Sequence, residues 1–271
     1  DWLPANDFLL TAQHQDDQAE TLLLQLLRGG GVNGLAAMPW SSMLGAGRHL
    51  RPLLDIRRAE LHRYARAHKL SWIEDPSNAD TSFDRNYLRQ RVLPVLQQRW
   101  PSAAASLSRS ASHCAEAAEL LEDLAGRDLL VLVGGENTLS LSGLTALPPL
   151  RQRNVVRHWI KQLTGATPSA AVLARIFNDV IGSRGDSEPC VRWDRFEMRR
   201  FRCELFLMPQ ASQMHQTGAL DWMLAESLVL PRAGGVLTAE PVTGRGLRAD
   251  AVAAGNVSVS WRRGGESCRP V

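Results

Sequence analysis

The sequence has 271 residues, of which 44% are hydrophobic and 22% are charged, and its formal net charge is only +3. No apolar run approaches the ~20 residues that span a bilayer, which argues against a membrane protein, and so small a net charge does not by itself predict RNA binding. We therefore expect a soluble globular protein, and at roughly 150 residues per domain the length predicts about two domains.

The start of the chain and its cysteines bear on where the protein works. The chain begins at Asp1 with no initiator Met and no signal-peptide pattern, which indicates that the natural N-terminus is not included. The four cysteines are widely spaced and form no C-x-x-C pair. This pattern favours reduced thiols in a cytoplasmic protein over a disulfide framework or a zinc site. The cysteines are Cys114, Cys190, Cys203 and Cys268.

In the first hundred residues, short apolar runs alternate with helical patterns, which predicts an α/β fold with a parallel, doubly wound sheet. Asp55 is the expected N-cap of the second helix, and the glycines at 29–31 end the first. A polar loop is expected at 76–84. The expected elements are, in order, a strand at 7–12, a helix at 16–28, a strand at 48–54, a helix at 56–68 and a strand at 70–73.

From Tyr87 the pattern becomes mainly helical, which indicates a second domain. Residues 189–208 alternate and are rich in β-branched and aromatic side chains, so two or three short strands are expected there. Weaker strand patterns occur at 228–240 and 257–261. The expected helices cover 87–100, 102–132, 149–163 and 169–181.

The segment at 11–38, TAQHQDDQAETLLLQLLRGGGVNGLAAM, is the strongest candidate for a site. If a helix begins near Asp16, then Asp17, Glu20 and Arg28 lie on one face. His14 stands at the end of the preceding strand, where open α/β sheets bind their ligands. Such carboxylates could hold an ammonium group or a magnesium ion. The alternative is that Asp16 and Asp17 only favour the helix dipole.

Two arginine-bearing segments are further candidates. Arg85 and Asn86 follow the polar loop and could face the same crevice, with a solvated helix start as the alternative. Arginines in the β-rich segment could contact an RNA backbone, unless they only solvate a strand face. The candidate tRNA-binding residues are Arg192, Arg195, Arg199 and Arg200.

These motifs resemble the tRNA(Ile)-lysidine synthetase family, whose members carry H-x-D-D-x-x-E-T followed by R-G-x-G-x-x-G-L. The resemblance continues through 72–94, 147–160 and 191–201, and 261–270 resembles the entry to the family's small C-terminal domain. The matching residues of the two motifs are His14, Asp16, Asp17, Glu20, Thr21, Arg28, Gly29, Gly31, Gly34 and Leu35.

The resemblance implies an incomplete Rossmann-like PP-loop ATP pyrophosphatase domain at 1–100 and a helical tRNA- and substrate-binding domain at 101–210. A linker and the start of the small C-terminal domain would occupy 211–271. The implied enzyme is an ATP-dependent ligase in the cytoplasm that joins L-lysine to the wobble cytidine of tRNA(Ile) with a CAU anticodon. ATP and Mg²⁺ are the implied cofactors, and a homodimer is one compatible assembly.

The resemblance also implies roles for single residues. Asp17 and Glu20 would hold the lysine ammonium or help to deprotonate the amine, while Asp16 and His14 would support Mg²⁺ or place the substrate. Asp16 is the implied Mg²⁺ ligand. The implied catalytic residues are His14, Asp16, Asp17, Glu20, Arg28, Arg85 and Asn86.

The sequence departs from the family pattern at one point. The S-G-G-x-D-S loop that cradles the ATP phosphates does not occur in it, so no ATP-binding residues are assigned and this chain alone is expected to be inactive. Two alternatives remain open. One is a noncatalytic tRNA-binding fragment. The other is a related PP-loop enzyme that thiolates tRNA, although such enzymes generally need catalytic cysteines.

Overall fold

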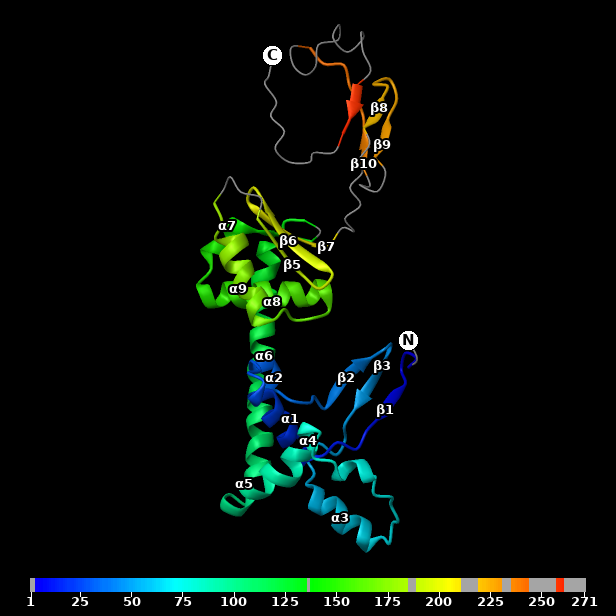
Figure 1. Cartoon of the computed structure of the whole chain (residues 1–271), viewed down its shortest axis with the longest axis vertical. Coiled ribbons are helices and arrows are strands. Elements are labelled where there is room, and N and C mark those ends of the chain that lie inside the picture. The colour runs from blue at the N-terminus through cyan, green and yellow to red at the C-terminus, as the bar shows by residue number, and fades with distance from the viewer. Residues whose placement is uncertain are drawn as a thin grey trace. The chain divides into compact units, whose positions relative to one another are not determined.

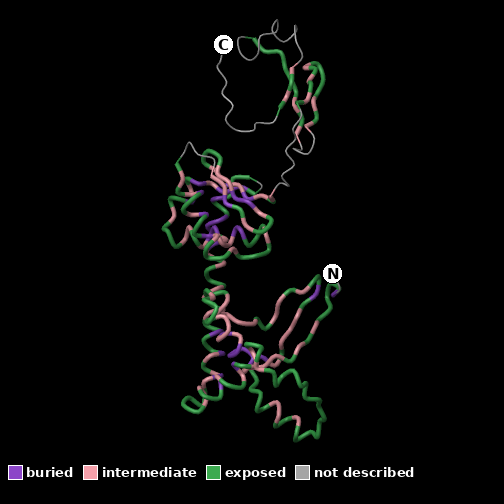
Figure 2. Tube along the Cα trace, in the orientation of Figure 1, coloured by how far each residue is buried: buried purple, intermediate pink, exposed green. Residues whose placement is uncertain are grey.

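The computed structural model describes residues 3–135, 137–184, 189–210, 219–230, 235–243 and 257–260. The chain divides into two compact units, residues 1–209 and residues 210–271. Figure 1 labels the elements along the chain, and Figure 2 marks where they are buried. None of the helices in the described residues combines the length and the apolar character that a membrane crossing needs.

A small three-stranded sheet with the order β1-β3-β2 opens the first unit (Figure 1). β1 (Phe8–Leu10) pairs in parallel with β3 (Gly47–Leu50), which confirms the predicted α/β class. β2 (Ser41–Leu44) pairs antiparallel with β3 through a tight turn in which Gly45 has a φ of +60°. This hairpin was not predicted, and it gives the sheet one antiparallel edge.

Helix α1 (Gln15–Leu27) follows β1 and agrees with the predicted helix to within one residue at each end. A capping box fixes its start: the Asp17 amide donates to His14 Nδ1, and the His14 amide donates to Asp17 Oδ2. Gly29, with a φ of +71°, follows its last turn and leads to the short helix α2 (Val32–Leu35).

Helix α3 (Arg58–Ala67) starts two residues later than predicted, and Asp55 is not its N-cap. The cap residue, Arg57, makes no side-chain capping bond. Instead, the backbone amide of Arg58 donates to Asp16 Oδ2 at 2.9 Å. Because this carboxylate comes from the start of α1, the cap could not be read from the local sequence.

The strand predicted at 70–73 is wrong. These residues form no strand, and the side chains of Leu70, Trp72 and Ile73 are exposed. A short apolar run favours a strand only where a neighbouring strand is there to pair with it. The polar loop that follows was predicted correctly and contains one turn of 3₁₀-helix, η1 (Pro76–Ala79).

The predicted helix at 87–100 exists but begins earlier and is irregular. It consists of α4 (Asp84–Tyr87), the π-helical segment η2 (Leu88–Val92) and α5 (Leu93–Arg99). Pro94 lacks the amide hydrogen that an α-helix would use here, and the π-helical turn directly precedes it. This irregular stretch packs beside α1.

The 30-residue helix α6 (Ala103–Leu132) joins the two parts of the first unit (Figure 1). Its first half packs against α1, α2 and α5, where Ala104 contributes to a small apolar cluster with Ala19 and Leu93. Its last turn places Leu129 and Leu132 in a second and larger core.

The second core lies between helices and a four-stranded antiparallel sheet of order β4-β7-β6-β5. Fully buried Val155, Ile160 and Met198 belong to this core. Strand β4 and helix α7 were not predicted. The elements are β4 (Thr138–Ser140), α7 (Leu141–Ala146), α8 (Pro149–Thr164), α9 (Ala170–Arg175), the π-helical η3 (Ile176–Ile181), β5 (Cys190–Trp193), β6 (Phe196–Phe201) and β7 (Glu204–Pro209).

The second unit consists of short antiparallel strand pairs in its described part. β8 (Leu220–Trp222) pairs with β11 (Val257–Val259), and β9 (Leu228–Leu230) pairs with β10 (Gly235–Leu237). The weak strand patterns at 228–240 and from 257 are thus confirmed, whereas β8 was missed. The segment 261–270 lies outside the described residues.

Candidate active site

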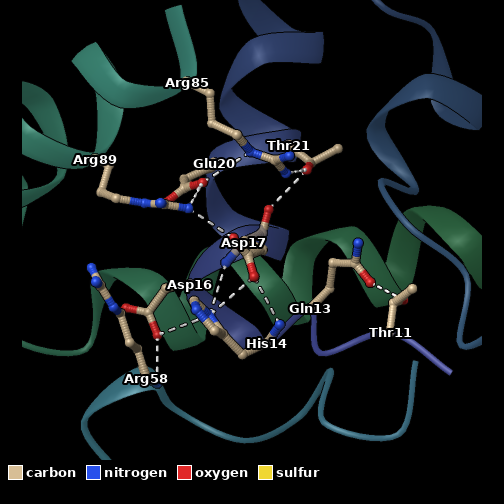
Figure 3. Close-up of polar contacts among 10 residues, drawn as sticks. All are labelled: Thr11, Gln13, His14, Asp16, Asp17, Glu20, Thr21, Arg58, Arg85 and Arg89. Carbon is tan, nitrogen blue, oxygen red and sulfur yellow. Dashed lines mark hydrogen bonds and ion pairs between the residues drawn. The ribbon is translucent and has the colours of Figure 1, made fainter. Parts of the chain in front are cut away.

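Glu20 stands at the centre of a charged cluster between α1 and the helical stretch after the polar loop (Figure 3). Its side chain is only 1% exposed. Arg89 Nε donates to Glu20 Oε1 at 2.6 Å, and Arg85 Nε donates to Glu20 Oε2 at 3.0 Å. Two guanidinium groups therefore compensate one buried carboxylate, which is the condition under which burial of a charge is tolerated.

Arg89 links Asp17 and Glu20. Its NH2 group donates to Asp17 Oδ1 and to Glu20 Oε2, each at 2.9 Å. The hydrogen bond to Glu20 raises the pKa of Arg89 above its ordinary value; burial opposes this, and the negative charges of Glu20, Asp17 and Asp16 reinforce it. The guanidinium is therefore a permanent cation at this position.

Arg85 is the more accessible of the two arginines, with 42% of its side chain exposed. Besides its bond to Glu20, its NH2 group donates to Thr21 Oγ1 at 2.8 Å, and Thr21 Oγ1 in turn donates to the Asp17 carbonyl. These contacts fix the plane of the guanidinium. A held and partly exposed guanidinium is suited to an anionic or carbonyl-bearing ligand.

His14 and Asp16 form the edge of the cluster at the start of α1 (Figure 3). His14 Nδ1 lies 3.3 Å from Asp17 Oδ2 and 3.9 Å from Asp16 Oδ2. Asp17 is thus bound on both oxygens, since Oδ1 accepts from Arg89. Asp16 Oδ2 caps α3 through the Arg58 amide. Asp16 and Asp17, in the first turn of α1, therefore connect α1 to α3 and to η2.

Two of the predicted catalytic residues lie apart from this cluster. Arg28 forms a solvent-exposed pair with Asp84 at 3.5 Å. Asn86 donates its side-chain amide to the carbonyls of Ser77 and Asp80, at 2.9 and 2.8 Å, and so supports the polar loop. Both residues lie near the site, but their observed contacts are structural.

Sequence reasoning missed Arg89. It singled out Arg85 and Asn86 because they open a helix, although Arg89 lies one turn after Arg85 and makes more contacts with the acidic pair. The i, i+4 spacing of the two arginines was a usable signal, because residues at that spacing share one helix face.

The predicted tRNA-binding arginines are largely engaged within their own sheet. Arg192 and Arg199 both donate to Glu197, at 3.0 and 2.7 Å, and Glu197 is only 5% exposed. The bond from Arg199 holds the pKa of Glu197 below its ordinary value; burial opposes this, and the bond from Arg192 adds to it. Arg200 donates to the Ser183 carbonyl, and Arg195 lies over the ring of Phe196.

Comparison with known proteins assigns both parts of the first unit. The PP-loop domain model matches residues 3–96, and the TilS substrate binding domain model matches residues 139–206. The tRNA(Ile)-lysidine synthase of Coxiella burnetii is 44% identical over 268 residues, which is 99% of this chain and 59% of the relative. That of Methylococcus capsulatus is 43% identical over 270 residues, covering 99% of this chain and 61% of the relative. The chain belongs to the tRNA(Ile)-lysidine synthase family.

The chain spans about 60% of the length of these curated relatives. The charged cluster of Asp17, Glu20, Arg85 and Arg89 lies in the segment that the PP-loop domain model matches. The sheet that carries Glu197 lies in the segment that the TilS substrate binding domain model matches. The family predicted from the sequence motifs is thus confirmed. The catalytic roles of the single residues stay predictions.

Proposed function

We propose that this protein acts as a tRNA(Ile)-lysidine synthase, an ATP-dependent carbon–nitrogen ligase that joins L-lysine to the wobble cytidine of tRNA(Ile) with a CAU anticodon. The product, lysidine, would change decoding from AUG to AUA. The observation that carries the proposal is the 43–44% identity over 99% of the chain to relatives with this name. The PP-loop match supports the use of ATP.

The proposed reaction has two steps. The C2 oxygen of the cytidine attacks the α-phosphate of ATP, and pyrophosphate leaves. The lysine ε-amine then attacks C2, loses a proton, and displaces AMP together with the C2 oxygen. The site must therefore hold an anionic nucleotide, accept a lysine ammonium group and take up a proton.

The charged cluster supports this proposal, provided that its acidic residues can share or release their arginine partners. Arg85 is anchored and partly exposed, so its remaining N–H donors can meet a phosphate or the cytidine carbonyl. The acidic residues are less free. Glu20 and Asp17 already accept bonds on both carboxylate oxygens, so a lysine ammonium group would have to share them with, or displace, an arginine.

The site could hold a magnesium ion only together with the phosphates of a bound nucleotide. In the part of the chain that the structure describes, no three His, Cys, Asp or Glu side chains gather into a metal site. Asp16 is 24% exposed and uses Oδ2 to cap α3. Because Mg²⁺ is commonly held by one or two carboxylates plus substrate phosphates, Asp16 could serve as a single ligand, and the ion would screen phosphate charge.

A cytoplasmic location accompanies the proposal, since a tRNA-modifying enzyme needs ATP and tRNA. Cys114, Cys190 and Cys203 are free thiols, which suits a reducing compartment. Whether the active assembly is a monomer or a homodimer is part of the same proposal, and sedimentation with and without tRNA would answer it.

The test is ATP-dependent incorporation of labelled lysine by the full-length gene product into a tRNA(Ile) transcript with a CAU anticodon. The matched control is the same transcript with its wobble cytidine changed to uridine. We expect incorporation into the first transcript only. Equal incorporation into both, or none into either, would contradict the proposed activity.

A further inference from the structure

A groove of about 1010 Å³ lies between helix α8 and the glycine-rich segment 29–34, apart from the charged cluster. Helix α6 contributes Leu121 and Glu122 to its lining, and α9 contributes Leu173. Both α2 and α8 pack on α6, so this long helix carries both walls of the groove (Figure 1).

The α8 wall is basic. Arg153, Arg157 and Lys161 follow one another at every fourth residue, so they share one face and rise roughly 6 Å per step along the helix axis. The opposite face of α8 is fixed in the core. Its buried residues are Val155, Val156, Trp159 and Ile160. Burial of that face therefore holds the row of cations toward the groove.

The charges in this row are only partly compensated. Lys161 pairs with Glu122 across the groove. Within the described ranges of the chain, the structure gives Arg153 and Arg157 no hydrogen bond or ion pair from their side chains. The lining thus holds three cationic side chains against one carboxylate. This contrasts with the strand arginines, of which Arg192 and Arg199 share Glu197.

The opposite wall is rich in glycine, with Gly29, Gly31 and Gly34 in its lining. A Cβ atom placed on Gly29 or Gly31 would meet no other atom within 4 Å, so neither glycine is required by crowding inside the protein. Gly29 has a φ of +71°, which requires glycine, whereas Gly31 does not have a positive φ. At these glycines no side chain stands between a bulky ligand and the backbone.

We propose that this groove binds the sugar–phosphate backbone of the RNA substrate, with Arg153, Arg157 and Lys161 of α8 as phosphate contacts. The inference rests on the proposed function for the identity of the RNA. The evidence for an RNA backbone is charge complementarity: a row of cations that is only partly compensated faces the glycine-rich segment and the polar side chains of Asn33 and Asn178. An acidic protein would be attracted to the same cations, and a direct measurement of RNA binding distinguishes the two kinds of ligand.

The test measures binding of the 271-residue chain to a tRNA(Ile) transcript across a salt series, by filter binding. The variant is Arg153→Gln with Arg157→Gln. The matched control is Arg109→Gln with Arg127→Gln, which removes the same charge from exposed positions on α6 outside the groove. Because each phosphate contact contributes about 0.7 to 0.9 to the log–log salt slope, the groove variant should lower the slope by about 1.5.

That slope change corresponds to affinity on the order of 30-fold weaker at 0.1 M salt if the 1 M intercept is unchanged. Thermal unfolding of both variants should match the parent chain. A groove variant whose slope equals that of the control would overturn the proposal, as would failure of the parent chain to bind tRNA at low salt. This experiment measures tRNA binding and not lysine incorporation. Failure of the proposed enzymatic activity is therefore distinguishable from failure of the proposed RNA-binding groove.

A second variant changes binding in the opposite direction. Glu122→Gln removes the carboxylate that occupies Lys161, so tRNA affinity should rise and the salt slope should steepen by up to about 0.9. Glu119→Gln, on an exposed position of the same helix, is the control. Equal effects from the two substitutions would count against Lys161 as a phosphate contact.

Discussion

Arg89 and Glu20 form a bidentate ion pair, with Arg89 Nε 2.6 Å from Glu20 Oε1 and NH2 2.9 Å from Oε2. The same NH2 group reaches Asp17, so one arginine joins η2 to two of the three acidic residues of α1. Because Glu20 is fully buried, its charge depends on Arg89, together with Arg85, for compensation.

Arg89→Met should therefore destabilise the protein by about 3 kcal/mol, since it leaves the buried Glu20 carboxylate with Arg85 as its one remaining arginine partner and removes the arginine partner of Asp17. Chemical denaturation followed by circular dichroism measures the loss. Arg91→Met is the control, because Arg91 is exposed on the same helical segment. If both variants lose equal stability, the bridging role of Arg89 is wrong.

Asp17→Asn should lower lysine incorporation by the full-length gene product by about 100-fold or more, the range of general acid–base contributions, while tRNA affinity stays unchanged. The reason is that Asp17 is only 8% exposed and lies in the charged cluster, away from the α8 groove. Asp84→Asn, which alters only an exposed pair, is the control. A parallel fall in tRNA affinity would show that Asp17 acts through the fold rather than in the reaction.

Substitutions at Asp16 should separate its structural role from the proposed magnesium role. Asp16→Ala removes the cap of α3, which is worth about 1 kcal/mol, whereas Asp16→Asn keeps a capping oxygen. Amide hydrogen exchange across 58–67 should quicken only in the alanine variant. If Asp16 also ligates Mg²⁺, the asparagine variant should need more Mg²⁺ for lysine incorporation, and an unchanged requirement would remove that role.

Glu197 should make stability depend on acidic pH. Its folded pKa lies below the ordinary value of 4.5, so its stabilisation is fully present above that value and is lost as the pH falls through the folded pKa. Glu197→Gln should cost about 2 kcal/mol at neutral pH, as charge-assisted hydrogen bonds would predict, and progressively less as the pH falls below 4.5. Denaturation over a pH series, with Glu119→Gln as control, tests this. A cost that does not change with pH would argue against the charged pairing.

Two glycines should respond to alanine with opposite signs. Gly126 lies inside α6, and a Cβ there meets nothing within 4 Å, so Gly126→Ala should stabilise by about 1 kcal/mol through helix propensity. At Gly47 the Cβ would lie 2.6 Å from the Asp7 carbonyl, so Gly47→Ala should destabilise by about 2 kcal/mol. Thermal unfolding measures both. If both variants shift the unfolding temperature equally and in the same direction, the structure around Gly47 accommodates the added Cβ and the predicted crowding costs no stability.

The sequence by itself determined the elements whose signals are local. The capping box of His14 and Asp17, the three-residue spacing from Asp17 to Glu20, and the long apolar period of α6 all act within a few helical turns. The local motif H-x-D-D-x-x-E-T at 14–21, with the glycine-rich segment after it, also carried the resemblance to the family, which the comparisons confirm.

Tertiary structure alone decided which charges meet. The sequence placed Asp17 and Glu20 on one face, but their arginine partners come from positions 65 to 72 residues further on. RNA contact by Arg192 and Arg199 stays a prediction from the sequence, but only packing showed that both also pair with Glu197 and that the α8 arginines face a groove. The physical reason is range: capping and periodicity depend on neighbouring residues, while ion pairing depends on how distant helices and strands pack.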